Sequence, residues 1–136
     1  MDFLKSMAIA ATGLRAQAGR MRIISENIAN ADSTPSAPGA DPYRRKIPTF
    51  QTEFDRAVGA SVVELGKTVT DKSDFQLRYE PGHPAADKNG NVKYPNVNPL
   101  VEMTDMREAQ RSYQANINVI TATRRMLQRT IDILKA

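Results

Sequence analysis

Apolar residues recur every seven positions in the first 31 residues, which is typical of an amphipathic helix with a narrow apolar face. One row of this face consists of Met7, Leu14, Met21 and Ile28. A second row at the complementary spacing consists of Leu4, Ala11, Ala18 and Ser25. The pattern predicts a helix over residues 3–31.

A longer repeat of the same kind runs from about residue 98 to residue 134. Asn98 is a suitable N-cap, and Pro99 suits the first helical position because its missing N–H is not needed there. The first row of the repeat is Met106, Tyr113, Ile120, Leu127 and Leu134. The second row is Met103, Gln110, Ile117, Arg124 and Ile131. Five successive heptads predict a coiled-coil helix.

The segment between these helices predicts loops and short strands. Residues 29–42 contain three prolines and a glycine and predict a loop. A short helical turn is predicted at residues 53–58. β-Branched and aromatic residues favour short strands, and we expect these at 45–50, 61–65, 67–71, 75–79 and 92–94.

Neither helix can bury its apolar face alone, so we expect the two to pair as a coiled coil. The predicted fold is mainly α with a small β-rich insertion. Residues 1–31 and 98–136 would form a terminal-helix coiled-coil domain, and residues 32–97 a loop and a small β-rich middle domain. The C-terminal helix is the longer one and overhangs its partner. Because other chains would have to cover the overhang, the pattern predicts a subunit of an assembly.

The composition argues against an enzyme. The 136 residues include no Cys, which removes thiolate nucleophiles and every zinc site that needs sulfur. The single histidine, His83, lies in a proline-rich loop, where a structural or surface role is the usual one. We therefore predict no catalytic residue, no metal site and no cofactor.

The charge is mildly basic, with 19 Lys and Arg against 15 Asp and Glu and a net charge of +4. This balance does not require a nucleic acid or an anionic membrane as partner. The C-terminal helix does concentrate arginines, at Arg107, Arg111, Arg124, Arg125 and Arg129. Acidic residues share that helix and no aromatic is interleaved with the arginines, so a solvated or neighbour-facing surface explains them better. A basic coiled-coil binding module for nucleic acid or a soluble partner stays open as the alternative.

The N-terminal segment does not have the pattern of a cleaved signal peptide. Its apolar stretch from Met7 to Leu14 is short, and Asp2 precedes the single Lys5. No apolar run approaches the roughly 18 residues that a membrane helix needs. Export by a route that leaves the N-terminus intact remains open.

Three blocks of sequence resemble one protein family. Ser25-Glu26-Asn27-Ile28-Ala29-Asn30-Ala31-Asp32-Ser33, preceded by Gly13-Leu14-x-Ala16-Gln17, resembles the N-terminal signature of the flagellar axial proteins, the rod and hook family. The block from Pro81-Gly82-His83-Pro84 to Tyr94-Pro95-Asn96-Val97 is similar to that of the C-type proximal rod proteins. Arg111-Ser112-Tyr113-Gln114-Ala115-Asn116 resembles the C-terminal helix of the family. Three blocks in this order, at this chain length, make a specific match.

The resemblance implies a structural, non-enzymatic subunit of the bacterial flagellar proximal rod, which assembles into a helical tubular shaft that transmits torque. It implies a location in the basal body, in the part of the rod that spans the periplasm. It further implies export by the flagellar type III apparatus without a cleaved signal peptide. The expected partners are other copies of the chain, other rod proteins and the export apparatus, with no nucleic acid and no insertion into a membrane.

The residues expected at the assembly interface combine apolar positions of the two helices with nearby side-chain amides. Amides are included because their directional hydrogen bonds fix how subunits meet. The expected residues are Leu14, Met21, Asn27, Ile28, Asn30, Met106, Tyr113, Gln114, Asn116, Ile117, Ile120, Leu127 and Ile131. For Asn27 and Asn30, a local role in ending the first helix is an equally open interpretation.

Overall fold

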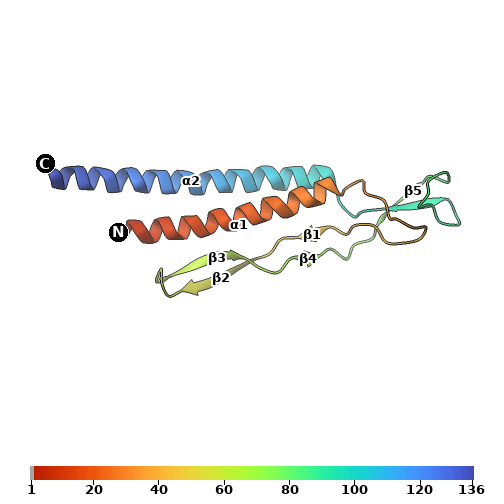
Figure 1. Ribbon diagram of the computed structural model, residues 1–136, viewed down its shortest axis with the longest axis horizontal. Helices are drawn as coiled ribbons and strands as arrows, with labels where there is room; N and C mark the ends of the chain where they lie inside the picture. The colour runs from red at the N-terminus through yellow and green to blue at the C-terminus, as the bar shows by residue number, and fades with distance from the viewer. Residues whose placement is uncertain (1) are drawn as a thin grey trace. The chain divides into compact units, whose positions relative to one another are not determined.

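The computed structural model describes residues 2–136 and is mainly helical with a small β insertion, as predicted (Figure 1). Two long helices occupy the ends of the sequence, α1 (Phe3–Ala29) and α2 (Pro99–Lys135). Six short strands lie between them: β1 (Lys46–Ile47), β2 (Phe50–Asp55), β3 (Ala60–Leu65), β4 (Val69–Thr70), β5 (Gln76–Tyr79) and β6 (Asn91–Tyr94). Neither helix in this part of the chain is long and apolar enough to cross a membrane.

Side chains at the helix ends explain where the helices begin and stop. Asp2 precedes α1, and its Oδ1 accepts the backbone N–H of Lys5 at 3.1 Å. At the other end of α1, Asn30 Nδ2 donates to the backbone carbonyl of Glu26 at 2.9 Å. Asn98 Oδ1 accepts the N–H of Leu100 at 3.1 Å, which confirms the predicted N-cap of α2.

The strands form three separate two-stranded antiparallel sheets: β1 with β4, β2 with β3, and β5 with β6. Each predicted strand overlaps an observed one, and the strand predicted at 45–50 is divided between β1 and β2. The helical turn predicted at 53–58 is wrong. β2 continues to Asp55, and its Oδ1 accepts the N–H of Ala57 at 2.8 Å to form the turn into β3.

The chain divides into two compact units, each built from parts of the helices and part of the middle segment. The first unit contains residues up to Met21, Thr49–Lys67 and Arg107–Ala136. The second unit contains Arg22–Pro48 and Thr68–Met106. The domain division expected from the sequence, 1–31 with 98–136 against 32–97, stays a prediction.

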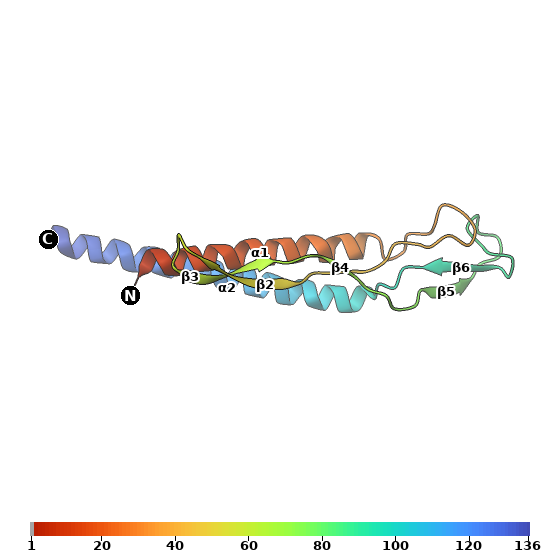
Figure 2. The same ribbon diagram turned by 90° about the horizontal axis from the view of Figure 1, so that it is seen from below.

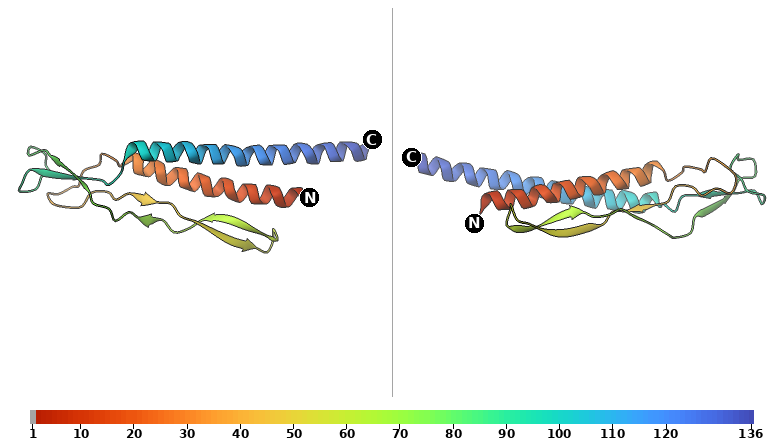
Figure 3. Two further views of the ribbon diagram at one scale, coloured as in Figure 1. Left: turned by 180° about the vertical axis from the view of Figure 1, so that it is seen from behind. Right: turned by 60° about the horizontal axis from the view of Figure 1, so that its bottom comes forward.

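In the first unit, the beginning of α1 lies antiparallel to the end of α2. Arg20 is 3.4 Å from Glu108, and a Cβ added to Gly13 would lie only 3.0 Å from the Asn116 amide nitrogen. The absence of a side chain at Gly13 therefore lets the two helices approach closely. Because Gly13 lies beside Asn116, the last turns of α2 extend past the first turn of α1 (Figure 3).

The β2–β3 hairpin packs on α1 through a second close approach. A Cβ at Gly19 would lie 2.7 Å from Leu65 Cδ2, so the bare helix surface at Gly19 accommodates the leucine side chain. Val62 of β3 is also buried. This packing leaves Phe50 and Phe54 of β2 exposed.

The second unit contains the β5–β6 hairpin, which Figure 2 shows, and a small core formed by β6 and the loop before it. Ala85, Val92 and Tyr94 are buried together. The guanidinium of Arg78 stacks 4.0 Å above the ring of Tyr94, which adds a cation–π contact to the core.

In each helix one of the two predicted rows is more buried than the other. Met7, Leu14, Met21 and Ile28 of α1 are half-buried, as are Met106, Tyr113, Ile120 and Leu127 of α2. The second row is mostly exposed in the single chain, although its members Ala11 and Ile117 are half-buried. In α1, Leu4, Ala18 and Ser25 are exposed, and in α2, Met103, Gln110, Arg124 and Ile131 are exposed.

Beside the large Ile23 and Ile24 of α1, several of the fully buried helix positions are occupied by small or polar residues. In α1 these include Ala10, Ala16 and Asn27, and in α2 they include Ala109 and Thr123. Small side chains allow helices to approach closely, which suits them to positions where two helices meet. The two predicted rows did not include these small buried positions.

Candidate assembly site

A buried polar cluster in the second unit is centred on Asn27, whose side chain is fully buried. Asn27 Nδ2 donates to the backbone carbonyl of Lys46 at 2.8 Å and to Glu102 Oε2 at 3.1 Å. Asn27 Oδ1 accepts the backbone N–H of Lys46 at 2.9 Å and the hydroxyl of Tyr43 at 2.8 Å. All four hydrogen-bonding positions of this amide are therefore occupied within the chain.

The same cluster contains a buried ion pair. Glu102 is 0% exposed, and its Oε1 accepts a hydrogen bond from Arg45 Nε. The Arg45 guanidinium also lies 3.6 Å from Asp71 Oδ2 and 3.7 Å from Asp105 Oδ2. One cation is thus shared by three carboxylates, and the pair joins the segment before β1 to the first turns of α2.

Asn96 connects the cluster to the chain that follows β4. Its Oδ1 accepts the backbone N–H of Arg45 at 2.8 Å, and its Nδ2 donates to the carbonyls of Asp71 and Ser73 at 3.1 and 3.2 Å. Side-chain amides therefore satisfy backbone groups here that no sheet satisfies.

The environment of the cluster shifts the pKa of its ionisable groups. Burial, together with the negative charges of Glu26 and Glu102, raises the pKa of Tyr43 to about 12. Burial opposes the charge of Arg45, but the hydrogen bond and charge of Glu102, with the charges of Asp71 and Asp105, outweigh it and raise the pKa of Arg45. Tyr43 therefore keeps the proton that it donates to Asn27.

The pKa of Asp71 is shifted in the opposite direction. Hydrogen bonds from the backbone and side chain of Ser73 lower it, with a smaller lowering contribution from Arg45 that works against burial. The backbone N–H of Ser73 donates to Asp71 Oδ1 at 2.9 Å. The carboxylate at this edge of the cluster is therefore held in its charged form.

The other amides predicted at an interface lie apart from this cluster. Asn30 bonds back to Glu26 at the end of α1, so Asn27 and Asn30 do not act as one pair. Asn116 Nδ2 donates to the carbonyl of Ser112 at 3.1 Å, beside Gly13. Gln114 is exposed, and its Nε2 donates to Asn118 Oδ1 at 3.1 Å on the surface of α2.

The predicted apolar interface residues lie mostly at the margin between the interior and the solvent. Half-buried positions are held by Leu14, Met21, Ile28, Met106, Tyr113, Ile117, Ile120 and Leu127, and Ile131 is exposed. α2 exposes further large apolar side chains, namely Leu100, Val101, Met103, Val119, Met126, Ile133 and Leu134. Ile133 is 76% exposed and Leu134 is 81% exposed, on the turns that extend past α1. These side chains are available to another chain.

Sequence reasoning missed Glu102, Arg45 and Tyr43 as members of the cluster. A signal was present for Glu102, which begins a heptad row continued by Ala109 and Thr123, both of them buried. A carboxylate at such a position is unfavourable without a cation. Nothing in the sequence could identify Arg45 as that cation, because the two residues meet only in the folded chain.

His83 has the structural role that the sequence favoured. Its Nδ1 accepts the backbone N–H of Ala85 at 3.0 Å within the loop before β6. Among residues 2–136, no group of three or more His, Cys, Asp or Glu side chains is placed to hold a metal ion.

Comparisons with known proteins match both helices and extend over the whole chain. A family model described as flagella basal body rod protein matches residues 7–37, and one described as flagellar basal body rod FlgEFG protein C-terminal matches residues 88–133. The flagellar basal-body rod protein FlgC of Agrobacterium fabrum is 58% identical over 137 residues, which cover 100% of this chain and 99% of that protein.

The chain belongs to the FlgC family of flagellar basal-body rod proteins. More distant members agree with this. FlgC of Salmonella typhimurium is 38% identical, with 98% of each chain covered, and FlgC of Bacillus subtilis is 35% identical, with 99% of this chain and 100% of that protein covered. Asn27 and Glu102 lie within the segments that the rod family models match, whereas Tyr43, Arg45 and Lys46 lie between them.

Proposed function

We propose that this chain is a structural subunit of the proximal rod of a bacterial flagellum. It assembles with other copies of itself and with other rod proteins into a helical tube that transmits motor torque. Full-length similarity to FlgC rod proteins is the observation that carries the proposal. The exposed apolar side chains of α2 support it, because a subunit of a packed tube needs such surfaces to bury against its neighbours.

The proposal includes pairing of α1 and α2 as a coiled coil inside the assembled rod. The contacts of Arg20 with Glu108 and the close approach of Gly13 to Asn116 support antiparallel packing. The exposed Leu4 and Met103 rows would then face neighbouring subunits. In this arrangement both predicted rows of each helix are used, one within the chain and one between chains.

We further propose that the chain is exported by the flagellar type III apparatus without a cleaved signal peptide, and that it acts in the part of the basal body that spans the periplasm. A short apolar stretch after Asp2 supports this route. Mass spectrometry of the protein from purified basal bodies would test it. The expected product retains its N-terminal residues, and a mature protein that begins inside α1 would contradict the proposal.

Deletion of the gene tests the function itself. The deletion strain should be non-motile and should lack rods beyond the membrane rings, and expression of the full chain should restore both. The protein should also be recovered in purified basal bodies. A motile deletion strain, or a protein absent from basal bodies, would contradict a rod function and would favour the nucleic-acid or soluble-partner alternative.

A further inference from the structure

α2 carries a row of exposed arginines on the side that faces away from α1. The row consists of Arg107, Arg111, Arg125 and Arg129. Arg107 and Arg125 are about five full turns apart at 3.6 residues per turn, so they share one line along the helix. The row extends for about 33 Å at 1.5 Å per residue. We call these four residues the arginine row.

The arginine row lies opposite the inner surface of α2. Asn116 packs beside Gly13 of α1, and Arg125 is rotated by about 180° from Asn116 around the helix. The neighbouring inner position Thr123 is only 4% exposed. Within the described residues, no member of the arginine row forms an ion pair. The row is therefore an unpartnered cationic surface.

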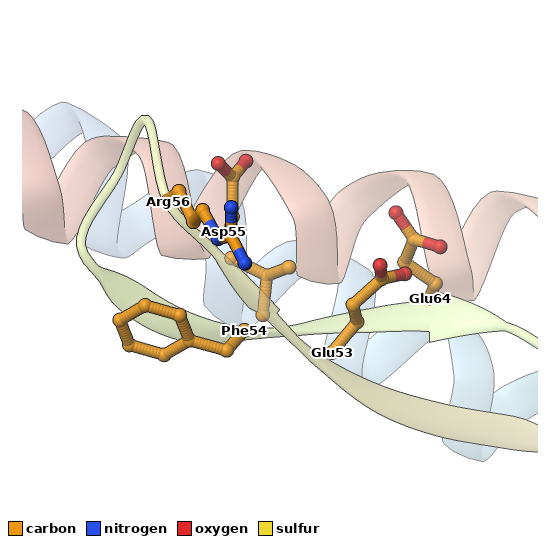
Figure 4. A pocket seen from close by; sticks show the side chains of 6 residues that line it. Glu53, Phe54, Asp55, Arg56 and Glu64 are labelled. Carbon is orange, nitrogen blue, oxygen red and sulfur yellow. The ribbon is translucent and has the colours of Figure 1, made fainter.

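The β2–β3 hairpin has the complementary chemistry. Glu53 and Glu64 extend to one side of the hairpin, and the ring of Phe54 extends to the other (Figure 4). The two glutamates are diagonal neighbours across the strands, since Glu53 pairs with Val62 and Gln51 pairs with Glu64. Both glutamates are exposed and, within the described residues, neither forms an ion pair.

A groove of about 470 Å³ lies on this part of the hairpin and is lined by Glu53, Phe54, Asp55, Arg56, Glu64 and the buried Val62. Its three carboxylates outnumber its one cation, Arg56, so the groove is acidic on balance. We call it the hairpin groove. An arginine suits it in two ways. Its aliphatic stem can cover Val62, and its planar guanidinium can bind carboxylates on both strands. Asp55 also lines the groove, but its Oδ1 is occupied by the N–H groups of Ala57 and Val58.

The two surfaces of one chain cannot meet each other. The hairpin is held on α1 by the packing of Leu65 on Gly19. The arginine row faces away from α1, because α1 contacts the opposite side of α2 at Asn116. A second copy of the chain would bring a partner to both surfaces at once.

We propose that the hairpin groove of one copy docks on the arginine row of α2 of a second copy. This rests on the proposed function, which places copies of the chain side by side in a rod. Each exposed ion pair corresponds to a factor of roughly 1.4 to 5 in an association constant. A row of four arginines and the repetition of the contact in an assembly multiply that factor. The contact should also weaken with added salt.

Cysteine cross-linking tests the contact directly, because the natural chain contains no cysteine. Glu64→Cys and Arg125→Cys would be placed on separate full-length copies and expressed together in flagellated cells. Oxidation of purified basal bodies should give a disulfide-linked dimer of the two variants. The matched control pairs Asp74→Cys, an exposed acidic position in the second unit, with Arg125→Cys and should give no dimer. Equal dimer yields from both pairs would overturn the proposal.

Charge reversal tests the same contact without a covalent cross-link. Arg125→Glu with Arg129→Glu should reduce the amount of protein retained in basal bodies several-fold, and so should Glu53→Lys with Glu64→Lys. Combining all four substitutions in one chain should restore retention, because each copy then offers both reversed surfaces. Lys72→Glu, an exposed substitution that reverses one charge elsewhere, should have no effect. If the fourfold variant has unchanged helicity by circular dichroism but is still not retained in basal bodies, the proposed docking is wrong.

The outcomes distinguish this inference from the proposed function. If both double variants assemble normal rods, the docking is wrong and the rod function stands. Cross-links from Arg125→Cys to a different rod protein alone would also show that the second copy is not the occupant. A different set of results would assign the arginine row to nucleic acid instead. The purified chain would bind DNA in a salt-sensitive way, and Arg125→Glu would abolish that binding. Cells that carry Arg125→Glu would still build normal rods.

Discussion

The side chain of Asn27 pairs with both backbone groups of Lys46, as a neighbouring strand would. Its Nδ2 donates to the Lys46 carbonyl at 2.8 Å, and its Oδ1 accepts the Lys46 N–H at 2.9 Å. One amide in the last turns of α1 therefore holds the start of β1. The same amide reaches Glu102 in the first turns of α2, so three segments that are distant in sequence meet at one residue.

Asn27→Ala should therefore impair the protein more than Asn30→Ala. The first substitution leaves buried partners unsatisfied and should cost about 1–3 kcal/mol for each. The second removes one half-buried bond to the Glu26 carbonyl and should cost about 0.5–1.5 kcal/mol. The measurement compares secreted protein with protein retained in basal bodies. We expect retention to fall while secretion is unchanged. A parallel fall in secretion would show that these residues act in export.

Glu102 and Arg45 should show strong coupling in a double-mutant cycle. Glu102→Ala leaves the Arg45 guanidinium in the interior without its closest carboxylate, which should lower the free energy of unfolding by about 3–5 kcal/mol. Replacing both with apolar residues, Glu102→Leu with Arg45→Met, should cost less than Glu102→Ala alone. Urea denaturation followed by circular dichroism gives the four free energies. Additive effects would contradict a buried pair.

Tyr43 should make stability sensitive to alkaline pH. The pKa of Tyr43 is raised to about 12 in the folded chain, against an ordinary value of 10.0. Since the pKa of Tyr43 is higher in the folded chain than in the unfolded chain, Tyr43 stabilises the folded chain fully below pH 10. This contribution to the free energy of unfolding is lost as the pH rises towards 12. The difference in phenolate absorbance between the natural chain and Tyr43→Phe isolates this titration. A difference curve centred at the ordinary value would contradict the burial of Tyr43 and its bond to Asn27.

Gly13→Leu should separate α1 from α2. Even a Cβ at this position would lie 3.0 Å from the Asn116 amide, so a larger side chain should cost about 1–3 kcal/mol by overpacking. Ala18→Leu, at an exposed position of the same helix, is the matched control for the folded chain. Thermal unfolding of both variants provides the comparison. A Gly13→Leu chain as stable as the Ala18→Leu chain would show that the close approach is unimportant.

Ile120→Asp should prevent rod assembly, whereas His83→Ala should leave motility nearly intact. Ile120 is half-buried on the inner row of α2, where an unpaired carboxylate should cost several kcal/mol. His83 accepts a hydrogen bond from the backbone of its own loop and is not among the expected interface residues. Swimming in soft agar, with immunoblots of purified basal bodies, measures both effects. Motile cells carrying Ile120→Asp would remove this row from the assembly.

The sequence by itself determined the two helices and most of the strands, because these depend on local features. The heptad spacing gave the extent of α1 and α2 to within two residues, and Asn98 was recognisable as the N-cap of α2. Three blocks of residues were also sufficient to indicate the flagellar rod family. The helical turn predicted at residues 53–58 was wrong, because residues 53–55 pair with β3 and stay extended before the turn.

Only the tertiary structure decided which surface of each helix is inside. Hydrophobic spacing cannot distinguish a row that packs within a chain from one that packs between chains, since both are apolar. The choice depended on how closely the backbones approach, which Gly13 and Ala109 permit and larger residues do not. The buried ion pair of Arg45 and Glu102 could not be predicted for a related reason. The two residues are far apart in sequence, and a buried carboxylate is tolerated only where the fold brings a cation to it.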